Sequence, residues 1–259
     1  MKIYILCDME GTSGIWQPEQ VQRGTPEYAE GRELLVGDVN AAIAGAFAGG
    51  VTQVVVCDTH GGGTHFPLVK MDERAAYETP ALGSPMPSLD ASFAGLMLTG
   101  HHAMAGTLNG FLDHTMNSAA WFCFKINGQP VGEIGMETAH AGHFGVPLIL
   151  VTGDEAACRE AEAMFPGVVT AAVKRGLGRN RAHCLPPRTA QALIRERAAE
   201  AVRRAPQLQP WRLTPPIELE LTVYRSDYAD AYTGKPGYMR VDARTVRRTV
   251  SSADQICRF

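Results

Sequence analysis

The chain has 259 residues, of which 45% are hydrophobic and 20% are charged, and its formal net charge is −3 at pH 7. This composition is ordinary for a globular protein with a sizeable core, and it excludes the strongly basic surface on which nucleic-acid-binding proteins depend. No apolar run approaches the roughly 20 residues that span a bilayer, and no signal-peptide pattern precedes the first predicted strand. We therefore expect a cytoplasmic protein that has neither nucleic-acid nor membrane partners.

Strands and helices alternate along most of the chain, as in an α/β fold. Apolar runs bounded by turn residues predict strands. These strands cover residues 2–7, 53–58, 93–100, 147–152 and 168–174. Apolar residues at helical spacing predict helices, with Thr25 and Asp154 as N-caps of two of them. The helices cover residues 25–47, 132–143, 154–165 and 186–204.

Antiparallel strands are predicted in two other parts of the chain. Residues 121–131 contain two strand-like runs around Asn127-Gly128, and this dipeptide is the strongest hairpin signal in the sequence. Residues 217–224 alternate between polar and apolar side chains, which is typical of a half-exposed antiparallel strand. Residues 240–250 are the expected partner of that strand.

The predicted fold class is α/β, with a mostly parallel central sheet flanked by helices and a smaller C-terminal α+β portion. We expect an α/β catalytic domain over residues 1–206. Residues 207–259 are expected to form a strand-rich portion that packs on this domain or mediates assembly. Residues 105–117 show no periodicity, and a long surface or active-site loop is predicted there.

Ionisable side chains follow the carboxyl ends of three predicted strands, and these ends lie along one edge of an open parallel sheet. The pairs are Asp8 with Glu10, Asp58 with His60, and His101 with His102. Because residues two apart on a strand project to the same side, Asp8 and Glu10 converge and require a cation, a shared proton or a basic partner. Carboxylates and imidazoles without thiolates suit Zn, Mn or Fe, and the excess of carboxylates suggests two metal ions with a bridging Asp.

Each candidate also has a simpler interpretation. These are a cap or turn role for Asp8, Asp58 and His60, an exposed loop position for His114, and a favourable place in the dipole of a helix start for Glu133. Of His101 and His102, at most one should point inward, because neighbouring strand residues face opposite ways. The other histidines are interpreted as structural or surface residues, namely His65, His140, His143 and His183.

Six short motifs carry a resemblance to a known family. They are DMEGTSG at residues 8–14, DTHG at 58–61, GHHA at 100–103, DHTM at 113–116, PVGE at 130–133 and TAAVK at 170–174. In this order the motifs resemble the DppA-like D-aminopeptidases, a family of zinc metallopeptidases, over residues 1 to at least 190. Where the family has an aromatic residue before the histidine of the third strand, this chain has His101.

The resemblance implies a dinuclear site with two Zn²⁺ ions per subunit. It implies Asp8, Glu10, His60, His102 and Glu133 as metal ligands and His114 as the catalytic residue, which is described in the family as a nucleophile. It also implies a homo-oligomer, a decamer of stacked pentameric rings whose active sites face an inner chamber and whose substrates are small peptides.

The resulting hypothesis is an aminopeptidase that hydrolyses the N-terminal residue, such as D-Ala, from short peptides or amino-acid amides. Glu10 or Asp58 is expected to anchor the free amino group of the substrate. For His114, a general base is chemically easier than a nucleophile, because imidazole titrates near neutral pH and metal-bound water already supplies a nucleophile.

Two alternatives remain open on the sequence. DMEGT at residues 8–12 imitates the DxDGT motif of haloacid-dehalogenase-like, Mg-dependent phosphatases, but its second acid is Glu. Cys158 also stands where such phosphatases have a further Asp, four residues after Asp154. The other alternative is a non-catalytic metal-binding assembly protein with the same scaffold and no turnover.

Overall fold

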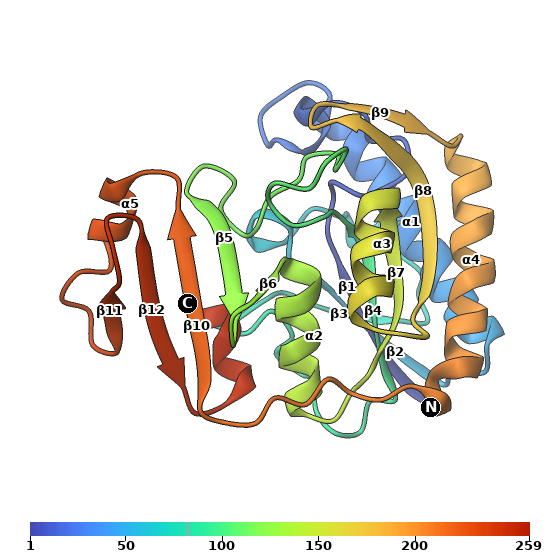
Figure 1. Cartoon of the computed structure of the whole chain (residues 1–259). Coiled ribbons are helices and arrows are strands. Elements are labelled where there is room, and N and C mark those ends of the chain that lie inside the picture. Colours follow the sequence, from blue (N-terminus) through green and yellow to red (C-terminus); the bar gives the residue numbers. More distant parts are fainter. Residues whose placement is uncertain (82) are drawn as a thin grey trace.

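Two sheets build the molecule, a computed structural model that describes residues 1–81 and 83–259 (Figure 1). The large sheet has seven strands in the order β3-β2-β1-β4-β7-β8-β9, and the second sheet has five in the order β11-β12-β10-β5-β6. Figure 1 shows helix α2 between the two sheets. The predicted α/β fold class is confirmed.

Parallel strands form most of the large sheet. Its strands are β1 (Lys2–Cys7), β2 (Gln53–Asp58), β3 (Ala76–Glu78), β4 (Gly95–His101), β7 (Leu148–Asp154), β8 (Val169–Gly178) and β9 (Arg181–Cys184). β1 lies at the centre and pairs in parallel with β2 on one side and β4 on the other. β9 is an antiparallel edge strand beside β8. The sequence did not predict β3 and β9, because short and partly exposed edge strands lack a continuous apolar run.

Helices cover both faces of the large sheet. The long helices are α1 (Tyr28–Ala48), α2 (Glu133–His143), α3 (Glu155–Met164) and α4 (Pro187–Arg204). α1 and α4 pack on each other over one face, while α2 and α3 cover the opposite face (Figure 1). Gly45 allows the close approach of α1 to α4, because a Cβ atom there would lie 2.3 Å from the carbonyl oxygen of Arg195.

The two predicted helix caps have different outcomes. Asp154 is the N-cap of α3, where its carboxylate accepts a hydrogen bond of 2.8 Å from the backbone N–H of Ala157. The prediction for Thr25 is wrong, because α1 begins at Tyr28. The hydroxyl of Thr25 instead donates to the carbonyl of Gln22 in the preceding turn, which competes with capping.

The second sheet combines the predicted hairpin with the C-terminal strands. It contains β5 (Trp121–Ile126), β6 (Gln129–Val131), β10 (Ile217–Val223), β11 (Tyr238–Arg240) and β12 (Thr245–Val250). β10 pairs with β12, as expected, and also with β5. Asn127 and Gly128 have φ values of 50° and 81°, as a tight hairpin turn requires. The division at residue 206 stays a prediction, and the second sheet takes strands from both sides of that position.

Helix α2 contributes to two hydrophobic cores. Ile134 and Ala141 pack in the core beneath the large sheet, while Met136 and Ala139 pack in the core of the second sheet. The shorter helices are η1 (Pro18–Val21), η2 (His60–Gly62), η3 (Leu68–Lys70), η4 (Ala205–Gln207), α5 (Ser226–Asp230) and η5 (Ala253–Arg258). Within the described parts of the chain, every helix is too short or too polar to cross a membrane.

Candidate metal centre

The carboxyl ends of β1, β2 and β4 meet at one edge of the large sheet, beside the start of α2. Two groups of potential metal ligands lie there, each with donor atoms within 4.8 Å of one another. One group contains Asp8, Glu10 and His60, and the other contains His102, His114 and Glu133. We call these six residues the metal centre. The structure thus brings together all the predicted site residues.

The first group is arranged around the imidazole of His60. Nδ1 of His60 lies 2.9 Å from Asp8 Oδ1 and 3.0 Å from Glu10 Oε2. The two buried carboxylates thus converge on one nitrogen, as predicted, but the turn after β1 and not strand periodicity brings them together, because β1 ends at Cys7. The other ring nitrogen of His60 lies 2.9 Å from the carbonyl oxygen of Val21.

The second group lies where β4 and α2 approach each other. Nε2 of His102 lies 3.4 Å from Glu133 Oε1, and Nε2 of His114 lies 3.6 Å from the same oxygen. The rings of His102 and His114 are stacked, with centroids 3.9 Å apart. The backbone N–H of Met116 donates to Glu133 Oε1 at 2.6 Å and so fixes that carboxylate.

Asp8 connects the two groups. Its Oδ1 atom faces His60, while its Oδ2 atom lies 3.3 Å from Nε2 of His102. A carboxylate with one oxygen directed to each ligand group can bridge two cations. Asp8 therefore fits the bridging role that the excess of carboxylates suggested.

Backbone carbonyls orient all three histidines. Carbonyl oxygens can only accept, so the nitrogen that faces each of them carries the proton in the neutral ring. The carbonyls belong to Val21 for His60, Ala103 for His102 and Leu112 for His114. The opposite nitrogen of each ring then presents its lone pair to the carboxylates of the metal centre. This is the usual way in which a protein orients an imidazole for metal binding.

The buried donor atoms fit a metal such as zinc. Nε2 of His102 and Oε2 of Glu10 are both buried and have no hydrogen bond of good geometry to any described residue. Lone pairs that face carboxylates in a buried site repel each other unless positive charge lies between them. Carboxylates and imidazoles in this number suit Zn²⁺. The structure therefore shows the same need for positive charge that the sequence predicted.

The pKa shifts of two residues in the metal centre indicate the same need for positive charge. Burial alone would lower the pKa of His60, but the nearby carboxylates of Glu10 and Asp8 raise that pKa to about 12. Burial would raise the pKa of Glu133, but His102 and His114 lower it to about 2. Protons held on these imidazoles and bound metal ions are two ways to neutralise the same carboxylates.

A bulge at Gly100 brings the end of β4 into position. Gly100 has a φ of 71°, and the register of β4 with β7 shifts between Leu98 and His101. A Cβ atom at Gly100 would lie 2.1 Å from the carbonyl oxygen of Asp8, so only glycine fits beside β1. Bulges change the direction of the following side chains, and here both His101 and His102 become buried.

His101 lies outside the metal centre and pairs with another carboxylate. Its Nε2 atom lies 2.7 Å from Glu137 Oε2, and both side chains are buried. Both adjacent histidines are buried, contrary to the expectation that at most one points inward, but only His102 faces the ligands. No role was predicted for Glu137, although it lies four residues after Glu133 and so on the same face of α2.

Asp58 also lies outside the metal centre. Its Oδ2 atom accepts a hydrogen bond of 2.6 Å from the backbone N–H of His65, and both carboxylate oxygens lie within 3.1 Å of Nδ1 of that residue. Asp58 is thus bound to His65, and its expected role as an anchor for the substrate amine stays a prediction. His65 has the structural role that was predicted for it.

Two buried side chains hold the loop that follows β1. Lys174 of β8 donates hydrogen bonds of 2.7 Å to the carbonyl oxygens of Glu10 and Ile15. Asp38 of α1 accepts hydrogen bonds from the backbone N–H and the hydroxyl of Ser13. Burial lowers the pKa of Lys174 to about 8. No role was predicted for Lys174, although a lysine at the end of the apolar run TAAVK indicates a buried ammonium group that needs hydrogen-bond partners.

The loop that carries His114 has an unusual backbone. Leu112 and Met116, two residues before and after His114, have φ values of 50° and 56°. Such values are uncommon for residues with side chains and persist only where the surroundings impose them. Here the backbone N–H of Leu112 donates to the carbonyl of Arg179 at 2.7 Å. The predicted active-site loop is thus held firmly around its histidine.

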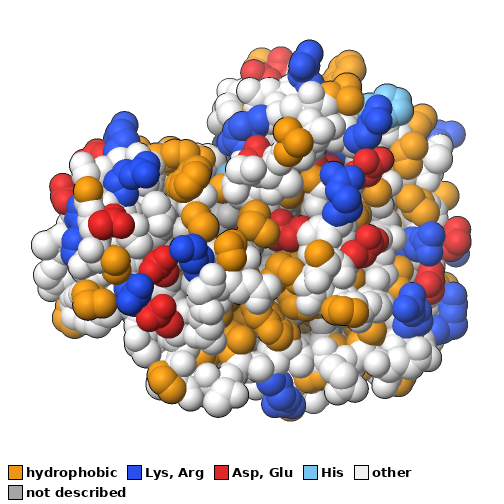
Figure 2. All heavy atoms as spheres, viewed as in Figure 1, with side chains coloured by type: hydrophobic (Ala, Val, Ile, Leu, Met, Phe, Trp, Pro, Cys, Tyr) orange, Lys and Arg blue, Asp and Glu red, His pale blue; other side chains and the backbone are white. Residues whose placement is uncertain are grey.

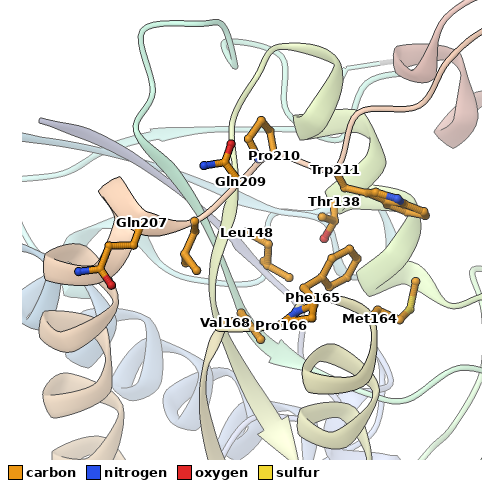
Figure 3. Close-up of a pocket in the computed structure, with 11 residues that line it drawn as sticks. Thr138, Leu148, Met164, Phe165, Pro166, Val168, Gln207, Gln209, Pro210 and Trp211 are labelled. Carbon is orange, nitrogen blue, oxygen red and sulfur yellow. The ribbon is translucent and has the colours of Figure 1, made fainter.

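A cavity of about 300 Å³ lies elsewhere, between α2, α3 and the segment after α4 (Figure 3). Figure 3 shows Trp211, Phe165 and Met164 around it. None of its described lining residues is ionisable. A second cavity, of about 240 Å³, adjoins the metal centre, and both Glu133 and Glu137 line it. Chemistry at the metal centre therefore concerns the second cavity.

Comparison with known proteins adds three findings. The sequence profile of a family described as D-aminopeptidase matches residues 1–259. A D-aminopeptidase from Bacillus subtilis (strain 168) is 36% identical over 233 residues, which cover 89% of this chain and 84% of that protein. The solved structure of the Zn-dependent D-aminopeptidase DppA from Bacillus subtilis, described as a self-compartmentalizing protease, matches with a TM-score of 0.95 and 31% identity. That match covers 100% of this chain and 94% of the other, so it includes both sheets.

Proposed function

The chain belongs to the D-aminopeptidase family, and on this premise we propose that it is a zinc-dependent aminopeptidase with a dinuclear site. Its substrates are short peptides or amino-acid amides, from which it removes an N-terminal D-residue such as D-Ala. One observation carries the proposal: two groups of buried ligands share the carboxylate of Asp8, and every histidine among them is oriented by a backbone carbonyl.

Each ligand has a distinct task in this proposal. Glu10 and His60 would hold one zinc ion, His102 and Glu133 would hold the other, and Asp8, which faces both groups, would be shared between them. When bound, the two ions polarise the scissile carbonyl and lower the pKa of a water molecule. The ligands come from β1, η2, the end of β4 and α2, and this rigid framework fixes the position of the substrate.

His114 is the catalytic residue of the proposal and acts as a general base. Its Nδ1 atom donates to the carbonyl of Leu112, so Nε2 faces the metal centre with a lone pair that can accept a proton. The proton is later available for the leaving amine. A nucleophilic role would require the same nitrogen to attack the carbonyl carbon, although it is stacked against the ring of His102.

Replacement of His114 by Ala tests this role. We expect turnover to fall by about 10²- to 10⁴-fold, as is usual for loss of a general base. Zinc content, measured by inductively coupled plasma mass spectrometry, should stay unchanged. His183→Ala, at an exposed position of β9, is the matched control and should keep full activity. Retained activity of His114→Ala would contradict both the base and the nucleophile.

The experiment that tests the function combines metal analysis with a substrate panel. We expect two zinc ions per chain and hydrolysis of D-aminoacyl amides and dipeptides in preference to their L-isomers. A chain that binds fewer than one zinc ion would contradict the dinuclear site. Magnesium-dependent release of phosphate from a generic ester, without peptide cleavage, would support the phosphatase alternative instead.

We also propose that the chain forms a homo-oligomer, a decamer of two stacked pentameric rings. The description of the relative DppA as self-compartmentalizing supports this proposal. Figure 2 shows hydrophobic side chains at the surface of the second sheet. Phe122 of β5 and Tyr224, which follows β10, are 43% and 44% exposed and contact each other. Light scattering coupled to gel filtration should give ten times the chain mass of 27.9 kDa.

A further inference from the structure

An aminopeptidase acts at the free amino terminus of its substrate, and a carboxylate beside the metal centre is a group that can bind this terminus as an ammonium ion. Burial of an ammonium group without a partner is costly, so a hydrogen-bonded negative charge is required. Within the metal centre, Asp8, Glu10 and Glu133 are directed at histidines. Asp58 is bound to His65. The carboxylates first expected to bind the amine are thus already engaged.

Glu137 is a carboxylate near the metal centre with one oxygen available. Its Oε2 atom is bound to His101. Its Oε1 atom has no hydrogen-bond donor among residues 1–81 and 83–259. Glu137 lines the cavity of about 240 Å³ that also borders Glu133. The walls of this cavity include Met116 and Met136, so the carboxylate is a polar group in a partly apolar pocket.

The spacing between Glu133 and Glu137 suits the dimensions of an aminoacyl group. Four residues of α-helix advance by about 6 Å. In an amino acid the nitrogen lies about 2.5 Å from the carbonyl carbon, and a charge-assisted hydrogen bond adds about 2.8 Å. A substrate whose carbonyl lies at the metal centre can therefore place its ammonium group against Glu137, one turn along α2.

His101 holds Glu137 in a fixed orientation. The pair is buried, with 2.7 Å between Nε2 of His101 and Oε2 of Glu137, and Nδ1 of His101 lies 3.2 Å from the carbonyl oxygen of Thr99. Charge-assisted hydrogen bonds of this kind fix a carboxylate before the ligand arrives and so lower the entropic cost of binding. This pairing accounts for a histidine where the sequence resemblance has an aromatic residue.

We propose that Glu137 binds the α-ammonium group of the substrate and that the adjoining cavity accommodates the first residue. The proposal rests on the aminopeptidase function and adds to it a substrate-binding residue and its partner, His101. Glu137→Gln keeps the size of the side chain and can still accept a hydrogen bond from His101, but it removes the negative charge.

Steady-state kinetics of the zinc-loaded protein with D-alanine p-nitroanilide provide the first test. For Glu137→Gln we expect KM to rise roughly ten- to hundredfold, as for the loss of a hydrogen bond to a charged group. The kcat should stay within about threefold, and the zinc content should not change. An unchanged KM at normal zinc content would overturn the proposal. If Glu137→Gln does not fold, Glu137→Asp provides the same test, because its shorter side chain withdraws the carboxylate from the ammonium group.

Glu160→Gln is the matched control. Glu160 is also a buried carboxylate near the centre, where it accepts a hydrogen bond from the backbone N–H of Met104, but it does not line the cavity beside Glu137. Its KM should stay within about twofold of the wild-type value. An equal rise of KM in both variants would indicate a general effect of buried charge and would overturn the specific role of Glu137.

A binding measurement separates this proposal from the function on which it rests. At pH 7, n-butylammonium should bind the zinc-loaded protein more tightly than n-butanol, and Glu137→Gln should lose this preference. If wild-type protein hydrolyses no aminoacyl amide, the proposed function fails. The affinities for n-butylammonium and n-butanol, measured by titration calorimetry, still test Glu137 in that case. Equal affinity of wild type and Glu137→Gln for n-butylammonium would overturn the proposal in either case.

Discussion

Lys174 helps to hold the loop that carries Glu10. Its ammonium group is buried in β8, far along the chain, and reaches two carbonyl oxygens of the loop after β1. Burial of a lysine is unfavourable by itself, as the lowered pKa of about 8 shows. The two hydrogen bonds offset this cost by holding a ligand-bearing loop against the sheet.

Replacement of Lys174 by Met keeps most of the side-chain volume and removes both donors. The carbonyls of Glu10 and Ile15 would then be left without partners, so we expect unfolding to become easier by about 2–4 kcal/mol. Zinc affinity should fall by about ten- to hundredfold, as after loss of an outer-shell partner. Urea unfolding and a competitive zinc chelator measure the two effects.

Lys125→Met is the comparison for this variant. Lys125 pairs with Glu220 on the second sheet and is partly exposed, so its loss should change the free energy of unfolding by less than about 1 kcal/mol. Zinc affinity should not respond. Normal zinc affinity in Lys174→Met would show that the loop keeps its position without the lysine.

At the scale of single residues, the sequence predicted the proposed metal ligands better than the residues that hydrogen-bond to the surrounding side chains. Asp8, Glu10, His60 and His102 follow strand ends, and parallel strands end at one edge, so their proximity was predictable. The partner of Asp58 was not predictable, because the choice between a metal and His65 depends on the turn formed by the glycines 61–63. That turn has no regular pattern in the sequence.

Helix α2 is the element that joins the metal centre to the rest of the molecule. Glu133 lies at its first turn, and His140 lies two turns later against η5. His140 is buried, and neither ring nitrogen has a hydrogen-bond partner within the described parts of the chain. Burial is the main cause that lowers its pKa to about 4. The positive charges of His143 and Arg258 also lower this pKa, while Asp254 raises it.

His140 should make the stability of the fold depend on pH. Its pKa in the folded protein, about 4, lies below the value near 6.5 of the unfolded chain. The unfolded state therefore binds more protons between these values, and stability is full above pH 6.5 and is lost as the pH falls toward 4. The loss amounts to at most about 3 kcal/mol. In His140→Leu this part of the pH dependence should disappear.

Urea unfolding of metal-free protein at pH 7.5 and pH 4.5 measures the difference. His183→Leu, on the exposed side of β9, is the control and should follow the wild type. If His140→Leu loses as much stability on acidification as the wild type does, His140 is not responsible. A gain of about 1 kcal/mol at pH 7.5 is also expected, because two unsatisfied nitrogen atoms are removed.

At the scale of elements, long periodic segments were predictable and short irregular ones were not. The apolar runs of β1, β2 and β7 and the helical spacing of α1 and α4 contain enough residues to identify each element. The bulge at Gly100 is different, because a single glycine can mark a bulge, a turn or a close contact. Only the approach of Gly100 to the Asp8 carbonyl distinguishes these possibilities.

For the whole molecule, zinc bound at the metal centre should stabilise the folded state. Its proposed ligands lie after β1, in η2, after β4 and at the start of α2, so bound zinc would link α2 to the hydrogen-bonded strands of the large sheet. Saturation with zinc at a hundred times its Kd stabilises the folded state by about 2.7 kcal/mol per site. Chelation should therefore lower the Tm by several degrees per site, and added zinc should restore it. Calorimetry with and without chelator measures this shift, and an unchanged Tm would contradict a shared metal site.

The strands of the second sheet are far apart in the sequence, and this separation affects how the sheet forms during translation. Hairpin β5–β6 leaves the ribosome long before β10, its partner strand, because α2, β7, α3, β8, β9 and α4 are translated in between. Nascent chains fold from the N-terminus as they emerge. The backbone groups of β5 that later pair with β10 are therefore unpaired during this time and can associate with other chains. Glu133 follows this hairpin directly, and its helix packs against the last residues of the chain. We therefore expect the metal centre to reach its final geometry, and to bind zinc fully, only after residues 253–258 have been synthesised and packed against α2.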